Sequence, residues 1–323
     1  MAFPFAGKNV LVTGGAGFIG SHVADRLVAE GCRVHVMDDL SGGVRGNVPE
    51  GATFHELDIR SDAAAALVEE HRFAALCHLA AQMDVRRSVA DPKFDADVNV
   101  LGFLNLLEAG KDHGLEKVAF ASTGGAIYGE PDPEVNGGGP QPETHPTRPM
   151  SPYGITKLVS EHYLRFYHQT YGIETAALRF GNVYGPRQNP HGEAGVVAIF
   201  AQRLLRGEPV TINGEGRQTR DYVFVGDVVR AFVAALAADG SGVFNVGTGV
   251  ETDVNELFRH INTHTGAGAD EVHGPAKPGE QERSVLDYSH TQEELGWTPE
   301  VDVATGLERT VDWFRQREAE RAA

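Results

Sequence analysis

The sequence predicts an α/β fold in which a doubly wound parallel sheet is followed by a smaller C-terminal α/β region. Two observations support this prediction. A strand, a glycine-rich turn, a helix and a second strand follow one another between residues 8 and 38, and strand and helix segments then alternate as far as residue 180. Alternation of this kind is typical of a parallel sheet whose two faces are both covered by helices.

The expected elements follow one another at short intervals. The first βαβ unit has strands over residues 8–13 and 33–38 around a helix over 19–30, a size typical of nucleotide-binding folds. Further strands are expected over 53–57, 75–79, 117–121 and 174–180, with helices over 63–70, 97–111 and 153–171.

Beyond residue 180 the pattern changes to turns rich in glycine, proline and arginine. A helix over 196–206, a late strand over 243–247 and an amphipathic helix over 303–317 are expected there. The late strand would return to the first sheet. We therefore expect one domain from residues 1–179 together with 226–250, and a substrate domain from 180–225 and 251–323.

Charge and composition exclude several classes of partner. The net charge of −17 argues against nucleic acid and against an anionic membrane surface. The first ten residues lack a basic stretch followed by an apolar one, and no run approaches the ~18 apolar residues of a membrane helix. Cys32 and Cys77 each stand alone beside apolar residues, as buried thiols do. A cytoplasmic protein is expected.

The first glycine cluster has the spacing Gly-x-x-Gly-x-x-Gly, formed by Gly14, Gly17 and Gly20. Between a strand and a helix, such glycines let backbone amides approach a pyrophosphate at the helix N-terminus. Asp38 ends the second strand, where a carboxylate suits the two ribose hydroxyls of NAD and repels the 2′-phosphate of NADP. Asp39 could share this task, whereas Arg45 leaves an opening for NADP.

Tyr153 and Lys157 stand one helical turn apart, directly after Pro152, which fits the first turn of a helix. A nearby ammonium stabilises a phenolate and would lower the pKa of Tyr153, which makes the phenol a usable acid and base. The spacing alone is a weak signal, since it also arises by chance on polar helices.

These motifs occur together with Leu79-Ala80-Ala81, Asn99 and a hydroxyl-bearing strand end before Tyr128-Gly129. Later segments are Leu178–Pro186, Thr219–Tyr222 and Phe244–Gly249. Together they resemble the extended short-chain dehydrogenases, in the branch of NAD-dependent nucleotide-sugar epimerases and dehydratases. The resemblance spans about residues 8 to 317. It implies a Rossmann-type fold, NAD as a bound cofactor, and a homodimer formed through helices 97–111 and 153–171.

The resemblance also requires a catalytic hydroxyl just before Tyr128. Many relatives place it where this chain has Gly124, so Thr123 or, less favourably, Ser122 must supply it. Dehydratases and decarboxylases carry acidic residues directly after that hydroxyl, whereas this chain has Gly125-Ala126, which cannot transfer a proton. The simplest remaining chemistry is a 4-epimerisation of a UDP-sugar through a 4-keto intermediate. The alternatives are a UDP-glucuronate 4-epimerase or decarboxylase, and an NAD-binding protein without turnover.

Site residues follow from the motifs and the resemblance together. The catalytic set is Tyr153, Lys157 and Thr123. The residues expected to bind NAD are Gly14, Gly17, Phe18, Ile19, Gly20, Asp38, Asp39, Asp58, Ile59, Leu79, Ala80, Ala81, Asn99, Tyr153, Lys157 and Phe180. The residues expected to bind the UDP-sugar are Thr123, Asn182, Val196, Thr211, Asn213, Arg220, Lys277, Arg283 and Ser284.

The assignment of Asp58 has an ordinary alternative, and that of Ser284 has a consequence for substrate specificity. Asp58 stands where an adenine amino group could be read, but a turn aspartate explains it almost as well. Ser284 occupies a position where some relatives have a bulky Tyr, so N-acetylated UDP-hexosamines could also fit. His260 and His264 stand four residues apart without an obvious third ligand, and no metal is expected.

Overall fold

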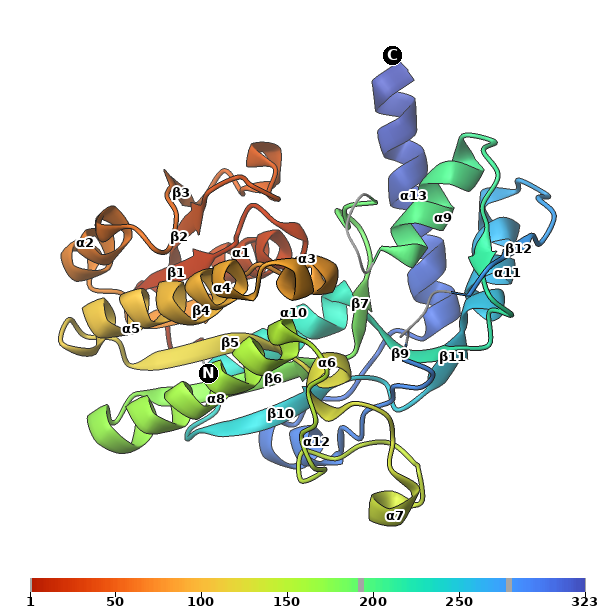
Figure 1. Ribbon diagram of the computed structural model, residues 1–323. Helices are drawn as coiled ribbons and strands as arrows, with labels where there is room; N and C mark the ends of the chain where they lie inside the picture. Colours follow the sequence, from red (N-terminus) through yellow and green to blue (C-terminus); the bar gives the residue numbers. More distant parts are fainter. Residues whose placement is uncertain (1, 191–194, 277–280, 323) are drawn as a thin grey trace.

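A seven-stranded parallel sheet forms the centre of the larger part of the molecule (Figure 1). The computed structural model describes residues 2–190, 195–276 and 281–322. The strand order is β10-β6-β5-β4-β1-β2-β3. The strands are β1 Asn9–Thr13, β2 Arg33–Asp38, β3 Thr53–Glu56, β4 Ala75–His78, β5 Lys117–Thr123, β6 Glu174–Phe180 and β10 Gly242–Val246. This confirms the doubly wound, Rossmann-type sheet, with its order reversing between β1 and β4.

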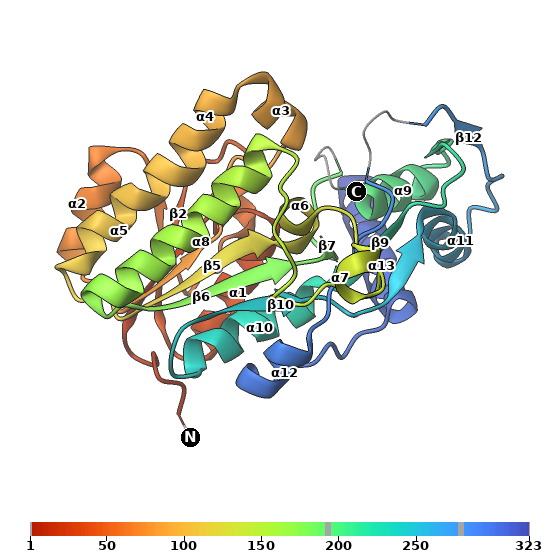
Figure 2. The same cartoon turned by 60° about the horizontal axis from the view of Figure 1, so that its bottom comes forward.

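Helices cover both faces of this sheet (Figure 2). One face carries α2 Asp62–His71, α3 Val85–Ala90, α4 Pro92–Ala96, η2 Asp97–Gly102, α5 Phe103–Lys111 and α8 Pro152–Tyr171. The other carries α1 Phe18–Ala29, α10 Val225–Ala237 and α12 Ser289–Leu295. Alternation along β1 separates the two cores, because Val10 and Val12 pack on the α1 side and Leu11 on the α5 side.

Short strands and several helices form the second part of the structure, around a core of their own. Three strands make one small sheet, β7 Asn182–Tyr184, β9 Thr219–Phe224 and β11 Glu251–Asp253, and β8 Ile212–Asn213 pairs with β12 His273–Gly274. The helices here are α9 Val196–Leu205, α11 Val254–Thr265 and α13 Val303–Ala322. Short helices elsewhere are η1 Arg45–Asn47, α6 Gly124–Tyr128 and α7 Pro133–Asn136.

The predicted helix over residues 97–111 is the element that differs most from expectation. Its first part, η2, is a π-helix, and only Phe103–Lys111 is α-helical. Gly102 lies against Ile59, so that a Cβ at this glycine would stand 2.8 Å from Ile59 Cδ1. The wider turn also carries the buried Asn99, whose side chain bonds to neighbouring elements. Among the described helices, none is both long enough and apolar enough to cross a membrane.

Candidate active site

The glycine turn after β1 is fixed by backbone contacts that leave no room for side chains. Gly14 has φ +67°, and a Cβ there would lie 2.7 Å from the backbone nitrogen of Ala80. A Cβ at Gly20 would lie 2.2 Å from the carbonyl oxygen of Gly14. Helix α1 starts with Phe18 and Ile19 after Gly17, and no hydrogen bond from a described side chain caps its N-terminus. The first-turn amides therefore suit a pyrophosphate.

Two strand ends beside this turn are held together by a side-chain pair that sequence reasoning missed. Thr13 Oγ1 lies 2.9 Å from His78 Nδ1 and accepts hydrogen bonds from the amides of Leu79 and Ala80. Burial lowers the pKa of His78 well below its usual range, so the ring is neutral. The pair fixes the segment Leu79-Ala80-Ala81 next to Gly14. Thr13 and His78 show no motif spacing, because they meet only when β1 and β4 pair.

Asp38 lies at the carboxyl end of β2 with its carboxylate turned toward the glycine turn. It accepts hydrogen bonds from the amides of Ala16, at 3.0 Å, and Leu40, at 2.9 Å. Burial raises its pKa, and these amides act in the opposite direction. A Cβ at Gly43 would stand 2.7 Å from Asp38 Oδ1, so the next loop passes close over the carboxylate. The Arg45 guanidinium stacks 3.8 Å above the Phe54 ring.

The remaining residues expected near the nucleotide differ in their exposure and in the partners of their side chains. Asp39 is exposed and accepts from the amide and hydroxyl of Ser41. Asp58 is paired with Arg60, which lowers the pKa of the carboxyl. The side chains of Ile59 and Phe180 are buried in the two cores of the sheet, so only their backbone could face a cofactor.

Tyr153 and Lys157 lie in the first two turns of α8, with Ser151 as N-cap accepting from the Gly154 amide at 3.2 Å. Lys157 Nζ donates to the carbonyl of Ala121 at 2.8 Å and lies 5.8 Å from the centre of the Tyr153 ring. Burial lowers the pKa of Lys157 to about 8. Burial raises the pKa of Tyr153, and the nearby Asp95 acts in the same direction. The lowered phenol pKa expected from Lys157 is thus opposed by desolvation, while the helix N-terminus favours the phenolate.

Asn99 serves as a structural link in the protein. Its side chain accepts from the Gln82 amide at 2.8 Å and donates to Gln82 O, Asp95 Oδ1 and Thr156 Oγ1. Thr156 also donates to Asp95 Oδ2 at 2.9 Å. This buried cluster ties η2 and α4 to α8 between Tyr153 and Lys157. Sequence reasoning found Asn99 but missed Asp95, Gln82 and Thr156, which become neighbours only through the packing of these helices.

Thr123 and Ser122 face opposite sides of β5, as adjacent strand residues do. Ser122 Oγ is buried and donates to Glu161 Oε1 at 2.5 Å, and Glu161 also accepts two bonds from Arg179. Thr123 Oγ1 is partly exposed at the end of the strand and accepts from the Ala126 amide at 3.3 Å. The Ser122 hydroxyl is thus committed to a buried bond with α8, whereas Thr123 carries the more accessible hydroxyl of the two.

Glycines also allow α6 to lie tightly between α8 and the segment that carries Ser284. A Cβ at Gly154 would stand 2.4 Å from the carbonyl oxygen of Ala126, so Tyr153 is positioned by a close backbone contact. A Cβ at Gly125 would lie 3.4 Å from Ser284 Oγ. The buried Ser284 is thus a neighbour of the strand end that bears Thr123.

The two arginines expected at the substrate diphosphate lie near one another on the second part of the structure. Arg283 forms an ion pair with Glu251, which also accepts from the Thr219 hydroxyl. Arg220 Nη1 donates to the Thr219 carbonyl at 2.7 Å. The other expected residues lie at the start of β7 (Asn182), at the start of α9 (Val196) and on or beside β8 (Asn213, Thr211). Lys277 lies outside the described residues.

Comparison with known proteins identifies the family of this chain. The sequence pattern of the NAD dependent epimerase/dehydratase family matches residues 10–247. Over 315 residues, the chain is 45% identical to the UDP-glucose 4-epimerase of Mycolicibacterium smegmatis, with 96% of this chain and 99% of that protein covered. The chain belongs to the NAD dependent epimerase/dehydratase family. The resemblance inferred from its motifs is confirmed.

Solved structures of this family superpose closely on the chain. The UDP-glucose 4-epimerase of Thermotoga maritima, determined with UDP-glucose, gives a TM-score of 0.92 at 47% identity, covering 96% of this chain and 99% of that one. The UDP-glucose 4-epimerase of Thermus thermophilus in complex with NAD gives 0.88 at 48% identity, covering 95% and 99%. As expected for this family, NAD is the cofactor, and the glycine turn and Asp38 fit it.

Proposed function

We propose that the protein is a UDP-glucose 4-epimerase that interconverts UDP-glucose and UDP-galactose with NAD bound throughout. The observation that carries this proposal is the set of groups at the carboxyl edge of the sheet. Thr123, Tyr153 and Lys157 supply a hydroxyl, a phenol and an ammonium, and the adjacent Gly125-Ala126 supplies no second proton-transferring group. Relatives named UDP-glucose 4-epimerase cover almost the whole chain.

Each side chain has a distinct task in this reaction. Bound NAD would supply the acceptor and donor of the hydride at C4 of the sugar. Tyr153 accepts the proton of the C4 hydroxyl as that hydride leaves, and gives it back when the sugar is reduced. Lys157 places a positive charge on the same helix face as the phenol, which stabilises its anion. Thr123 offers a hydroxyl that bridges the sugar oxygen and the phenol.

Epimerisation requires a firmly held nucleotide and a sugar that can turn over within the site. We assign the binding of the diphosphate to Arg220, Arg283 and Asn182, with Lys277 as a further cation. One arginine guanidinium can donate two parallel hydrogen bonds to two oxygens of a phosphate group. Thr211 and Asn213, on a short two-stranded sheet, would flank the uracil, and Val196 would contact the substrate from the start of α9. Arg283 would have to exchange part of its bond to Glu251 for the diphosphate.

The small side chain of Ser284 extends the expected substrate range. It is buried beside Gly125, next to the position proposed for the sugar. Since a serine occupies little volume there, the C2 substituent could be a hydroxyl or an acetamido group. We therefore propose that UDP-N-acetylglucosamine and UDP-N-acetylgalactosamine are interconverted as well.

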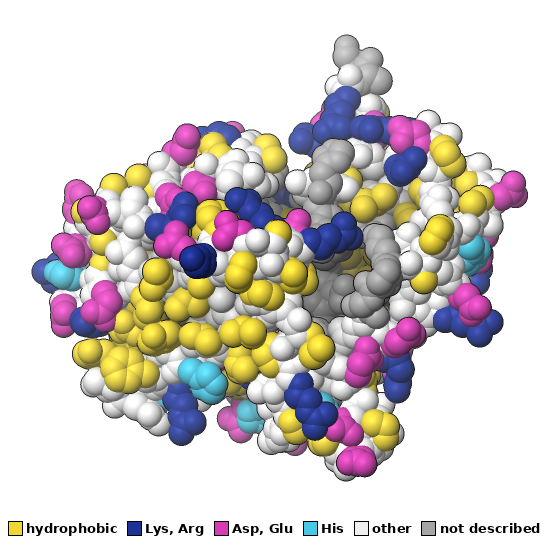
Figure 3. Space-filling view, viewed as in Figure 1, with side chains coloured by type: hydrophobic (Ala, Val, Ile, Leu, Met, Phe, Trp, Pro, Cys, Tyr) yellow, Lys and Arg dark blue, Asp and Glu magenta, His cyan; other side chains and the backbone are white. Residues whose placement is uncertain are grey.

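We further propose two domains, a homodimer and a cytoplasmic location. The NAD-binding domain would comprise residues 1–179 and 226–250, and the substrate domain 180–225 and 251–323. Supporting the dimer, hydrophobic side chains gather over α5 and α8 (Figure 3). Exposed members on η2 and α8 are Leu101, Ile155, Tyr163, Phe166 and Tyr171. Both cysteines are buried free thiols, as in a reducing compartment.

The proposal is tested by incubating purified protein with UDP-galactose, UDP-N-acetylgalactosamine, UDP-glucuronate and dTDP-glucose, without added NAD. Products are identified by NMR. Interconversion of UDP-galactose and UDP-glucose is the expected result. Selective turnover of UDP-glucuronate, or a requirement for added NADH with a net-reduced product, would overturn the proposal.

A further inference from the structure

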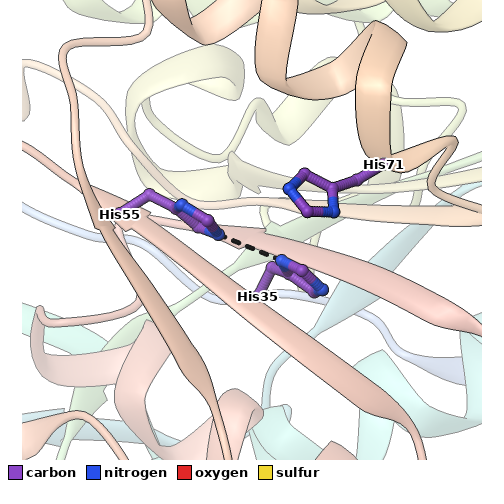
Figure 4. A group of neighbouring side chains, drawn as sticks. All are labelled: His35, His55 and His71. Atoms are coloured by element: carbon purple, nitrogen blue, oxygen red, sulfur yellow. Dashed lines mark hydrogen bonds between the residues drawn. The ribbon is translucent and has the colours of Figure 1, made fainter.

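Three histidines that are far apart in the sequence converge at the outer edge of the large sheet (Figure 4). His35 lies in β2, His55 in the edge strand β3, and His71 ends α2. One nitrogen from each ring can be chosen so that all three lie within 4.8 Å of one another. His35 Nδ1 and His55 Nε2 are already 3.0 Å apart.

The surroundings keep these rings closely packed but reachable from the surface. His35 is buried, whereas His55 and His71 are half-buried. The rings of His35 and His55 are stacked at 5.3 Å between centroids, and Phe73 closes the inner side 5.1 Å from the centre of His35. Asn9 Nδ2 donates to the backbone carbonyl of His71 at 2.7 Å, which anchors the end of α2 beside β1.

Two rings of the cluster, His35 and His55, have pKa values below the ordinary value of histidine. Burial lowers the pKa of His35 to about 4 and also lowers the pKa of His55, with the neighbouring rings acting in the same direction. The Arg33 guanidinium on β2 lowers the pKa of His35, and the Glu70 carboxylate on α2 raises that of His55. A neutral imidazole is the form that coordinates metals.

We propose that His35, His55 and His71 form a binding site for a divalent transition-metal ion, with Zn²⁺ as its best match. Three imidazole nitrogens with one open position for water are a common zinc arrangement. Zinc–nitrogen bonds of about 2.0–2.1 Å place tetrahedral ligand atoms about 3.3 Å apart, so the widest separation must shorten. Rotation of half-buried side chains, chiefly His71 at the helix end, achieves this.

Coordination would replace the hydrogen bond between His35 and His55. Each ring would donate a nitrogen lone pair to the ion and keep a proton on its other nitrogen. The ion would link β2, β3 and α2, three elements that meet at an open sheet edge. Its role is structural, because the proposed chemistry lies at the carboxyl ends of β5 and the start of α8.

The test uses the NAD-loaded protein after treatment with a chelator. Zn²⁺ binding is measured by calorimetry, and Co²⁺ binding by the visible absorption of a tetrahedral site. One equivalent with micromolar or tighter affinity and a raised Tm is expected. His55→Phe preserves the ring packing and should weaken binding at least about 100-fold. His71→Gln, at the more accessible ligand, should weaken binding as well.

One control variant separates this site from adventitious binding. His260 and His264 form another histidine pair, with rings stacked 6.4 Å apart on α11. The variant His260→Gln should leave Zn²⁺ affinity unchanged. Stacked imidazoles without a metal function would show no saturable binding, or binding that His55→Phe and His71→Gln leave intact, and either result overturns the proposal. Epimerase activity should persist in both variants at moderate temperature.

Discussion

The two sides of the proposed active site are built in different ways. The glycine turn after β1 is held by backbone contacts, and a Cβ at Gly14 or Gly20 would lie well inside normal contact distance of other backbone atoms. On the substrate side, the Arg283 side chain is 46% exposed and pairs with the carboxylate of Glu251, which lies on the short strand β11. Backbone packing around the glycines stays the same when a ligand binds. The arginine of an exposed ion pair can instead leave its carboxylate and bind a ligand.

This difference matches what the reaction demands of each ligand. NAD has to remain in place through oxidation and reduction, so a rigid cradle suits it. The nucleotide-sugar has to enter and leave, so groups that change partners suit it. Substitutions on the two sides and at the proposed proton-transferring residue test this division.

Tyr153→Phe removes the phenolic oxygen and keeps the ring. Loss of the proton-transferring group should lower kcat by about 10³-fold or more. The amount of NAD that copurifies should stay the same, because the glycine turn is untouched. Activity is measured by NMR and NAD content by absorbance after denaturation. Loss of NAD together with activity would mean that the two sides are not independent.

Gly20→Ala tests the rigid side. The added methyl group would stand 2.2 Å from the Gly14 carbonyl oxygen, so the turn must shift. We expect a loss of roughly 3 kcal/mol in the free energy of unfolding, as for other overpacked sites, together with loss of NAD. Gly42→Ala is the matched control, because nothing lies within 4 Å of its added Cβ. Equal behaviour of the two variants would contradict a backbone-built cradle.

Much of the rigid side could be predicted from the sequence because its signals are local. Spacing identified Gly14, Gly17 and Gly20, and strand position identified Asp38. Thr13, His78 and Asp95 could not be found in this way, because they act through neighbours brought together by strand pairing and helix packing. The π-helical turn at η2 was also missed, since residues 97–111 have the pattern of an ordinary helix.

Lys157→Met tests the buried ammonium beside Tyr153. The pKa of Lys157 is about 8 in the folded protein, against an ordinary value of 10.5. Between pH 8 and 10.5 the unfolded chain binds more protons than the folded protein, so the free energy of unfolding rises with pH in this range. Below pH 8 Lys157 is protonated in both states, and burial of the charge then costs its full amount of stability. Between pH 8 and 10.5, the free energy of unfolding of the wild type should rise by about 2 kcal/mol relative to that of Lys157→Met.

Urea unfolding at several pH values measures this difference in free energy. The charged groups that act on the pKa of Lys157 are Asp95 on α4 and Glu161 on α8, and Lys157 in turn lowers the pKa of His78 on β4. Lys111, a half-buried lysine paired with Glu108 on α5, is the control. A difference between wild type and Lys157→Met that does not change with pH would show that the ammonium is not desolvated.

Ser284→Tyr tests the substrate side and has the smallest expected effect. A large ring beside Gly125 should lower kcat/KM for UDP-N-acetylgalactosamine about tenfold through the lost space, while UDP-galactose turnover is retained. NAD content should not change. Both substrates are assayed with the same preparation. An equal loss for both would place Ser284 away from the C2 substituent.

The three histidines illustrate what sequence reasoning could not reach on the outer edge of the sheet. His35, His55 and His71 have no metal-ligand spacing, and each belongs to a different element. They meet only because β2 pairs with β3 and α2 ends beside both. His260 and His264, which do have a suspicious spacing, lie on one helix, and among the described residues they belong to no group of three metal-ligating side chains.

The central claim is that C4 is oxidised and reduced within one site while the cofactor stays bound. It is tested most directly with UDP-galactose that carries deuterium at C4, incubated with purified protein in ordinary water. NMR and mass spectrometry follow the label. The account predicts that the UDP-glucose formed keeps its C4 deuterium, with none lost to solvent. Exchange of that deuterium for solvent hydrogen during turnover would contradict it.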